Sequence, residues 1–176
     1  MRPVPAPSVE RGMERQSQRG IERSRGFTLI EMVVVVMIVG ILASAAMPLA
    51  ALHKRRTQEA ELRHALRTLR VALDDHKRAW DAGRIPKKPE DSGYPANLDV
   101  LVQGVPDVGS AKGQRIYFLR RLPRDPFADP ATPAALTWST RSYASPPDSP
   151  APGSDVFDVA SRTEGIGLDG VPYRQW

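Results

Sequence analysis

Hydrophobic residues form one unbroken stretch near the start of the chain, at residues 27–52, and Glu31 is the only formal charge inside it. About 20 apolar residues are enough to cross the ~30 Å hydrocarbon core of a bilayer as a helix, so this stretch predicts a transmembrane helix. Gly40, Ser44 and Pro48 occur in it at four-residue spacing, which fits either close packing of another helix or simple tolerance of small residues. Because Pro48 removes one backbone hydrogen bond, we expect the helix to bend there.

From residue 53 to residue 80 the pattern becomes amphipathic, with apolar positions three and four residues apart. This periodicity predicts that the helix continues beyond the membrane and buries one face against another part of the chain. Asp81, Gly83 and Pro86 then supply signals that end a helix. The predicted buried stripe comprises Leu62, Leu66, Leu69, Leu73, His76 and Trp80, and the charged residues Arg63, Arg67, Arg70, Asp74 and Lys77 lie off it.

The rest of the chain is loop-rich, since it holds 13 of the 17 prolines and only short apolar runs. Alternating apolar residues at 136–143 and 154–160 favour two strands of a small antiparallel sheet. The proline-rich segment 144–153 separates them as a loop, and residues 97–102 fit one short helix. Residues 114–119 fit either a strand or a helical turn. The predicted fold class is therefore α+β, with a long N-terminal helix packed on a small antiparallel sheet.

A charged leader, residues 1–26, carries six arginines and three glutamates, so it contributes +3 of the formal net charge of +5. The remaining chain is nearly neutral, and we expect no nucleic-acid partner. The chain has no cysteine, which excludes disulfides and thiolate metal sites. Met1 and Met13 both fit as the start of the leader. Charge alone does not orient the apolar helix, because basic residues flank both of its ends: Arg19, Arg23 and Arg25 before it, and Lys54, Arg55 and Arg56 after it.

The residues at the start of the apolar stretch, Arg25-Gly26-Phe27-Thr28-Leu29-Ile30-Glu31, resemble the processing and assembly motif of the type IV pilin-like family. The resemblance implies that a prepilin peptidase cuts between Gly26 and Phe27 and methylates the new amine of Phe27. It also implies that Glu31 guides the assembly of subunits into a filament. An uncleaved signal anchor is the alternative, although here the polar leader and the proposed cut both precede the apolar stretch, unlike a secretory signal.

Landmarks in the second half extend the resemblance to the major pseudopilins of type II secretion systems. They are Tyr94-Pro95, the segment Leu122-Pro123-Arg124-Asp125-Pro126-Phe127, the segment Asp158-Val159-Ala160-Ser161, the tripeptide Leu168-Asp169-Gly170, and Trp176. Two features depart from that pattern: the proline-rich insertion at 144–153 and the short tail after Asp169.

The resemblance implies a pilin-like fold and a structural, non-enzymatic subunit of a periplasmic filament for protein secretion. The subunit would span the inner membrane once through residues 27–52, continue as an amphipathic helix over residues 53–80, and place residues 81–176 in the periplasm. Its partners would be further copies of itself, the prepilin peptidase, other pseudopilins and the inner-membrane assembly platform. A minor pilin of a type IV pilus and a membrane-anchored periplasmic binding protein that never polymerises are the alternatives.

Two carboxylates are candidate site residues. A carboxylate within a membrane helix is costly, and two explanations for Glu31 stand side by side: the resemblance supplies the ammonium of Phe27 on a neighbouring subunit, and Thr28 with Glu31 fits a local capping box. By the same resemblance Asp169 lies near the calcium loop of major pseudopilins, although a turn aspartate is the simpler explanation. The histidines His53, His64 and His76 show no catalytic or metal-ligand spacing, and nothing in the sequence argues for an active site.

Overall fold

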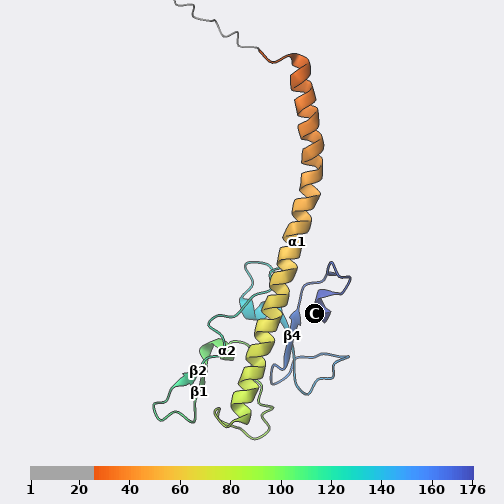
Figure 1. Ribbon diagram of the computed structural model, residues 1–176. Coiled ribbons are helices and arrows are strands. Elements are labelled where there is room, and N and C mark those ends of the chain that lie inside the picture. Colours follow the sequence, from red (N-terminus) through yellow and green to blue (C-terminus); the bar gives the residue numbers. More distant parts are fainter. Residues whose placement is uncertain (1–25) are drawn as a thin grey trace, which may run out of the picture. The chain divides into compact units, whose positions relative to one another are not determined.

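The computed structural model describes residues 26–176, except for the side chain of Ala45 (Figure 1). All of the predicted leader except Gly26, including both candidate start residues, lies outside this part of the chain. The chain divides into two compact units, Met1–Ser44 and Ala45–Trp176. Its elements are α1 (Leu29–Asp81), α2 (Val100–Gln103), β1 (Val105–Pro106), β2 (Arg115–Ile116), the 3-10 helix η1 (Ala134–Thr137), β3 (Trp138–Arg141), β4 (Asp158–Ser161) and the 3-10 helix η2 (Tyr173–Gln175).

In the first unit, the described residues are 26–28, which precede the helix, and the beginning of α1, and their side chains are exposed throughout. Helix α1 is long and apolar enough to cross a membrane, as the hydropathy pattern predicted. The hydroxyl of Ser44 is satisfied within the helix, since it donates to the carbonyl of Ile41 at 2.7 Å. Pro48 lies inside α1, and a bend at this residue stays a prediction.

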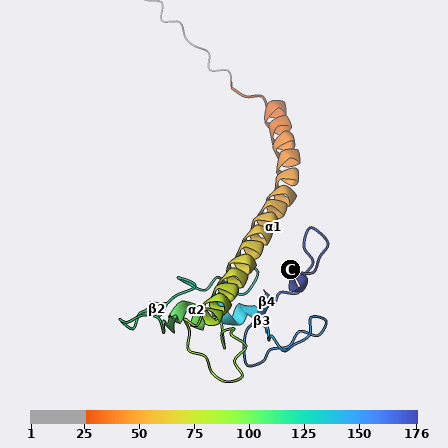
Figure 2. The ribbon, with the colours of Figure 1, turned by 60° about the horizontal axis from the view of Figure 1, so that its bottom comes forward.

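In the second unit, one hydrophobic core forms between α1 and the segments that follow it. The predicted leucine stripe supplies the α1 side of this core, and Leu101 of α2, Trp138 of β3 and Val159 of β4 pack against it. Both views place α2 and β4 next to α1 (Figure 1, Figure 2). His76 is buried, as the stripe predicted, whereas Trp80 is only partly buried. The buried leucines are Leu62, Leu66, Leu69 and Leu73.

Two small antiparallel sheets complete the second unit. Strands β1 and β2 pair Val105 with Ile116, which resolves the segment 114–119 in favour of a short strand. Strands β3 and β4 pair Trp138 with Ser161 and Arg141 with Asp158. The α+β fold class, a long apolar N-terminal helix followed by a small antiparallel sheet, is therefore confirmed.

Strands β3 and β4 are shorter than the alternating pattern predicted, for identifiable reasons. Pro133 starts a 3-10 turn, in which Leu136 donates to the carbonyl of Pro133 at 2.9 Å, so the first strand begins only at Trp138. The second strand was expected to start at residue 154. It starts later because the backbone N–H of Val156 donates to the carbonyl of Pro95 at 2.8 Å and not to a neighbouring strand. Main-chain hydrogen bonds to Pro133 and Pro95 thus take the place of ladder bonds before each strand begins.

Candidate functional site

The start of α1 shows the predicted capping box. Glu31 donates its backbone N–H to the hydroxyl of Thr28 at 3.2 Å, and the Thr28 N–H approaches Oε2 of Glu31 at 3.5 Å, the long limit of a hydrogen bond. Gly26 precedes the helix, and a Cβ added to it would meet nothing within 4 Å. Packing within residues 26–176 therefore does not require glycine at position 26.

The apolar side chains on both sides of this cap are exposed within the described chain. Phe27 is 75% exposed, Leu29 83% and Val36 70%. Isolated exposed apolar residues are common, but a continuous exposed run of this length indicates contact with lipid or with another protein. The structure therefore places Phe27 and Glu31 beside an apolar surface that is exposed within the described residues.

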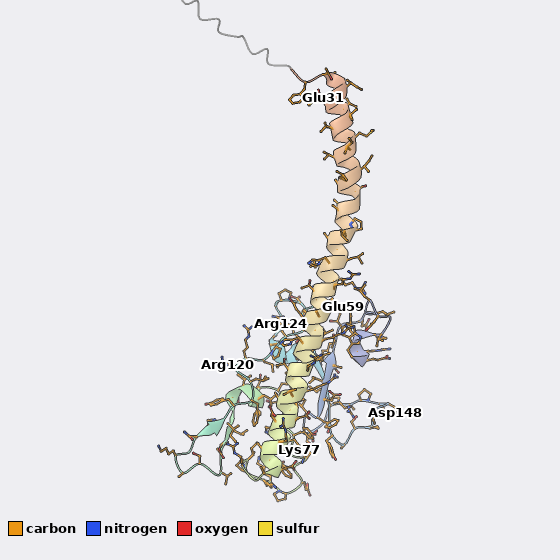
Figure 3. All side chains as sticks on the ribbon, in the orientation of Figure 1. Glu31, Glu59, Lys77, Arg120, Arg124 and Asp148 are labelled. Carbon is orange, nitrogen blue, oxygen red and sulfur yellow. The ribbon has the colours of Figure 1, made fainter. Side chains whose placement is uncertain are left out.

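A second polar arrangement lies on α1 within the second unit and was not foreseen from the sequence. Glu59 is buried, and its Oε1 accepts hydrogen bonds from the backbone N–H of Leu168 and from the hydroxyl of Tyr173, both at 2.9 Å. Arg55 donates to the carbonyl of Ile166 and approaches the Tyr173 hydroxyl at 3.4 Å. Burial raises the pKa of Tyr173, so its phenol stays protonated and donates to Glu59. Figure 3 labels Glu59 on α1, at the level of the C-terminal segment.

Two further arginines of α1 continue this arrangement toward the C-terminal end of the helix. Arg63 pairs with Asp169 at 2.6 Å and lies over the ring of Trp176 at 4.2 Å. Arg70 pairs with Asp158 at 2.8 Å and donates to the main-chain oxygen of Trp176 at 2.7 Å. We call the four α1 residues that hold the C-terminal segment the polar clamp: Arg55, Glu59, Arg63 and Arg70.

Asp169, the predicted calcium residue, is engaged by protein groups. One carboxylate oxygen pairs with Arg63, and the other accepts the backbone N–H of Val171 at 3.0 Å, as in an aspartate turn. Calcium needs six to eight oxygen ligands, usually from several carboxylates. Within residues 26–176 no group of three or more His, Cys, Asp or Glu side chains could hold a metal ion. Asp169 therefore has the contacts of a turn aspartate, and a calcium role stays a prediction.

Other buried titratable groups have structural partners. Asp125 accepts hydrogen bonds from Ser161 and from the backbone N–H of Phe127, the latter at 2.8 Å. His76 lies 2.9 Å from the carbonyl of Gly93 through Nδ1, and burial lowers its pKa. Both groups thus form hydrogen bonds with other residues of the chain, an arrangement typical of a structural role.

The comparisons with known proteins agree with these features. The sequence model of the family described as "Prokaryotic N-terminal methylation motif" matches residues 22–47. Type II secretion system core protein G of Aeromonas hydrophila is 32% identical over 109 residues, which cover 61% of this chain and 71% of that protein. The protein of the same name from Pectobacterium carotovorum is 34% identical over 122 residues, or 64% of this chain and 73% of that protein. No solved structure matches the chain.

The structure agrees with these matches, because its apolar helix starts at the methylation motif and the later half of that helix packs on a small sheet. Relatives above 30% identity are covered over more than two thirds of their length. The chain belongs to the family of type II secretion system core protein G and is a pseudopilin.

Proposed function

We propose that this chain is a structural subunit of a type II secretion pseudopilus that is cut between Gly26 and Phe27, methylated at Phe27 and assembled into a periplasmic filament through Glu31. The observation that carries the proposal is a single carboxylate at the start of a helix segment whose described apolar side chains are all exposed. Such a segment needs lipid before assembly and neighbouring subunits after it. No described residue packs against position 26 in a way that demands glycine, which supports recognition of Gly26 by an external enzyme, the prepilin peptidase.

Before assembly, residues 27–52 cross the inner membrane once, with the leader in the cytoplasm. Residues 53–80 continue the helix, and residues 81–176 form the periplasmic domain. In the filament the partners are copies of this chain and other pseudopilins, added by the inner-membrane assembly platform. Names of the relatives support this assignment over a pilin of a type IV pilus.

Glu31 takes its proposed role from charge. In a filament the helices leave the lipid and bundle together, so the ammonium of Phe27 would lie in a medium of low dielectric. An unpaired charge there costs several kcal/mol, and an opposite charge offsets that cost only at close range. The carboxylate of Glu31 on the adjacent subunit supplies this partner and thereby sets the axial register. The capping box of the monomer uses the same side chain weakly, through one contact of 3.5 Å.

The test compares Glu31→Leu with Thr28→Val in cells that assemble the filament. Thr28→Val removes the hydroxyl that caps Glu31 but leaves the carboxylate in place. We expect Glu31→Leu to insert, to be cut after Gly26 as shown by mass spectrometry of the mature amino terminus, and to form no filaments. We expect Thr28→Val to assemble like the unaltered chain.

The two variants distinguish the intersubunit role from capping. Equal losses of filaments in both variants would mean that helix capping is sufficient to explain Glu31, and normal filaments with Glu31→Leu would exclude the assembly role. An intact leader on the membrane-bound unaltered chain would exclude the proposed processing itself.

A further inference from the structure

An exposed apolar loop, residues 165–172, projects from the second unit. Three of its side chains are exposed although they are hydrophobic: Ile166 at 57%, Leu168 at 44% and Val171 at 38%. The loop is a closed turn, because Gly167 donates to the carbonyl of Val171 at 2.8 Å and Gly170 takes a positive φ of 82°. Its apolar side chains are therefore held outward by an ordered backbone.

The polar clamp fixes the height of this loop along α1. Arg55 binds the carbonyl of Ile166, and Glu59 binds the N–H of Leu168. Arg55 follows Leu52, the last residue of the apolar stretch, by three residues, or about 4.5 Å of helix rise. The head-group region adds about 5–7 Å on each side of the hydrocarbon core. If the apolar stretch spans the membrane as proposed above, Ile166 lies at the level of the lipid head groups.

Charges around the loop favour a lipid surface. Lys54 and Arg56 are exposed and belong to the basic group that directly follows the apolar stretch. Arg63 pairs with the carboxylate of Asp169, so that acid does not oppose an anionic surface. Glu164, just before the loop, is an exposed carboxylate, but the exposed cations Lys54 and Arg56 outnumber it. Basic residues next to a membrane segment are attracted to anionic lipids.

We propose that residues 165–172 lie in the interfacial layer of the bilayer before assembly, with the side chains of Ile166, Leu168 and Val171 among the lipid head groups and upper acyl chains. Lys54 and Arg56 contact lipid phosphates beside them. Lipid is the partner of this loop, because the loop backbone is bound to α1 at residues that closely follow the apolar stretch. This inference rests on the proposed membrane insertion of residues 27–52. The contact between the loop and lipid fixes the orientation of the periplasmic unit on the membrane before the subunit enters a filament.

The test uses the absence of cysteine in this chain, which makes any introduced cysteine a unique labelling site. The full mature chain carries Ile166→Cys with an environment-sensitive NBD dye, in vesicles of phosphatidylethanolamine and phosphatidylglycerol at low protein density. Val108→Cys is the matched control, since Val108 is 61% exposed and its N–H binds Arg84, just beyond the far end of α1. Leu168→Cys gives a second, independent reading of the loop.

We expect nitroxide lipids to quench the dye at Ile166 and Leu168 several-fold more than at Val108, and less so in vesicles without phosphatidylglycerol. Equal quenching at Ile166 and Val108 would overturn the inference. Protection of Ile166 that arises only at high protein density, without lipid quenching, would overturn it in favour of a second copy. A Val36→Cys label in the apolar stretch reports on insertion: quenching there without quenching at Ile166 refutes the loop contact alone, and no quenching at Val36 refutes the proposed membrane insertion as well.

Discussion

Removing the buried carboxylate of the polar clamp should destabilise the second unit strongly. Glu59→Leu keeps a side chain of similar size but leaves the N–H of Leu168 and the hydroxyl of Tyr173 without their acceptor. A hydrogen bond to a charged group contributes about 1.5–3 kcal/mol, so even at the lower end of this range the loss of two lowers the unfolding free energy by about 3 kcal/mol. The neighbouring pair with Arg55 adds little, because the Arg55 side chain is 45% exposed and lies 3.5 Å away.

Thermal unfolding of the full chain in detergent micelles, followed by near-ultraviolet circular dichroism, measures this loss. For a domain of this size about 3 kcal/mol corresponds to a fall of about 10 °C in melting temperature. Glu61→Leu is the matched control, since Glu61 is an exposed glutamate on the same helix. Tyr173→Phe and the variant that combines it with Glu59→Leu complete a double-mutant cycle. Because the two side chains share a hydrogen bond, their effects on the unfolding free energy should deviate from additivity by about 0.5–3 kcal/mol. A Glu59→Leu protein that melts within a degree or two of Glu61→Leu would refute the clamp.

Three further outcomes are expected in the same assay. Leu69→Ala should cost about 2–5 kcal/mol, because Leu69 is fully buried, whereas Val71→Ala at an exposed site should change little; equal effects would contradict the predicted core. Burial lowers the pKa of His76 below its ordinary 6.5, so below about pH 6.5 the unfolded state binds a proton more readily than the folded state, and stability should fall as pH drops. His76→Phe should reduce this loss of stability, and an unchanged pH profile in that variant would exclude His76 as the cause. Calcium should leave the melting temperature unchanged in the unaltered chain and in Asp169→Asn. A rise with calcium in the unaltered chain that is absent in Asp169→Asn would show that Asp169 helps to bind calcium.

Periodicity predicted the helix and its buried leucines well, because these features depend on residues near one another in sequence. The apolar stripe at three- and four-residue spacing identifies the face of α1 that packs, whatever segment covers it. The same spacing also runs through Arg55, Glu59 and Arg63, and this was the available signal for the polar clamp. It was not recognised because a charged helix face is ordinarily solvated, and the partners of these residues lie more than 100 positions later in the chain.

The sheet and the candidate sites show where sequence reasoning stopped. The boundaries of β3 and β4 depend on Asp155, whose carboxylate binds the backbone N–H of Tyr143 at 2.9 Å and removes that group from the ladder. Burial acts to raise the pKa of Asp155, but hydrogen bonds led by that of Ser92 outweigh it and hold the pKa below its ordinary value. The capping box of Thr28 and Glu31 was predicted because it is local. The partner of Asp169 was not, since choosing between Arg63 and calcium requires the tertiary fold.

The arrangement of buried groups along α1 separates folding from assembly. The described side chains of the first unit are exposed, and buried apolar positions on α1 begin only at Leu62, beyond the polar clamp residue Glu59. The buried indole of Trp138 therefore reports on the core of the second unit alone. Because Glu31 contributes nothing to that core, its replacement should leave the unfolding signal of Trp138 unchanged even where filaments are lost. Replacement of Glu59 should act in the opposite order, lowering the amount of folded subunit first and the number of filaments only in proportion.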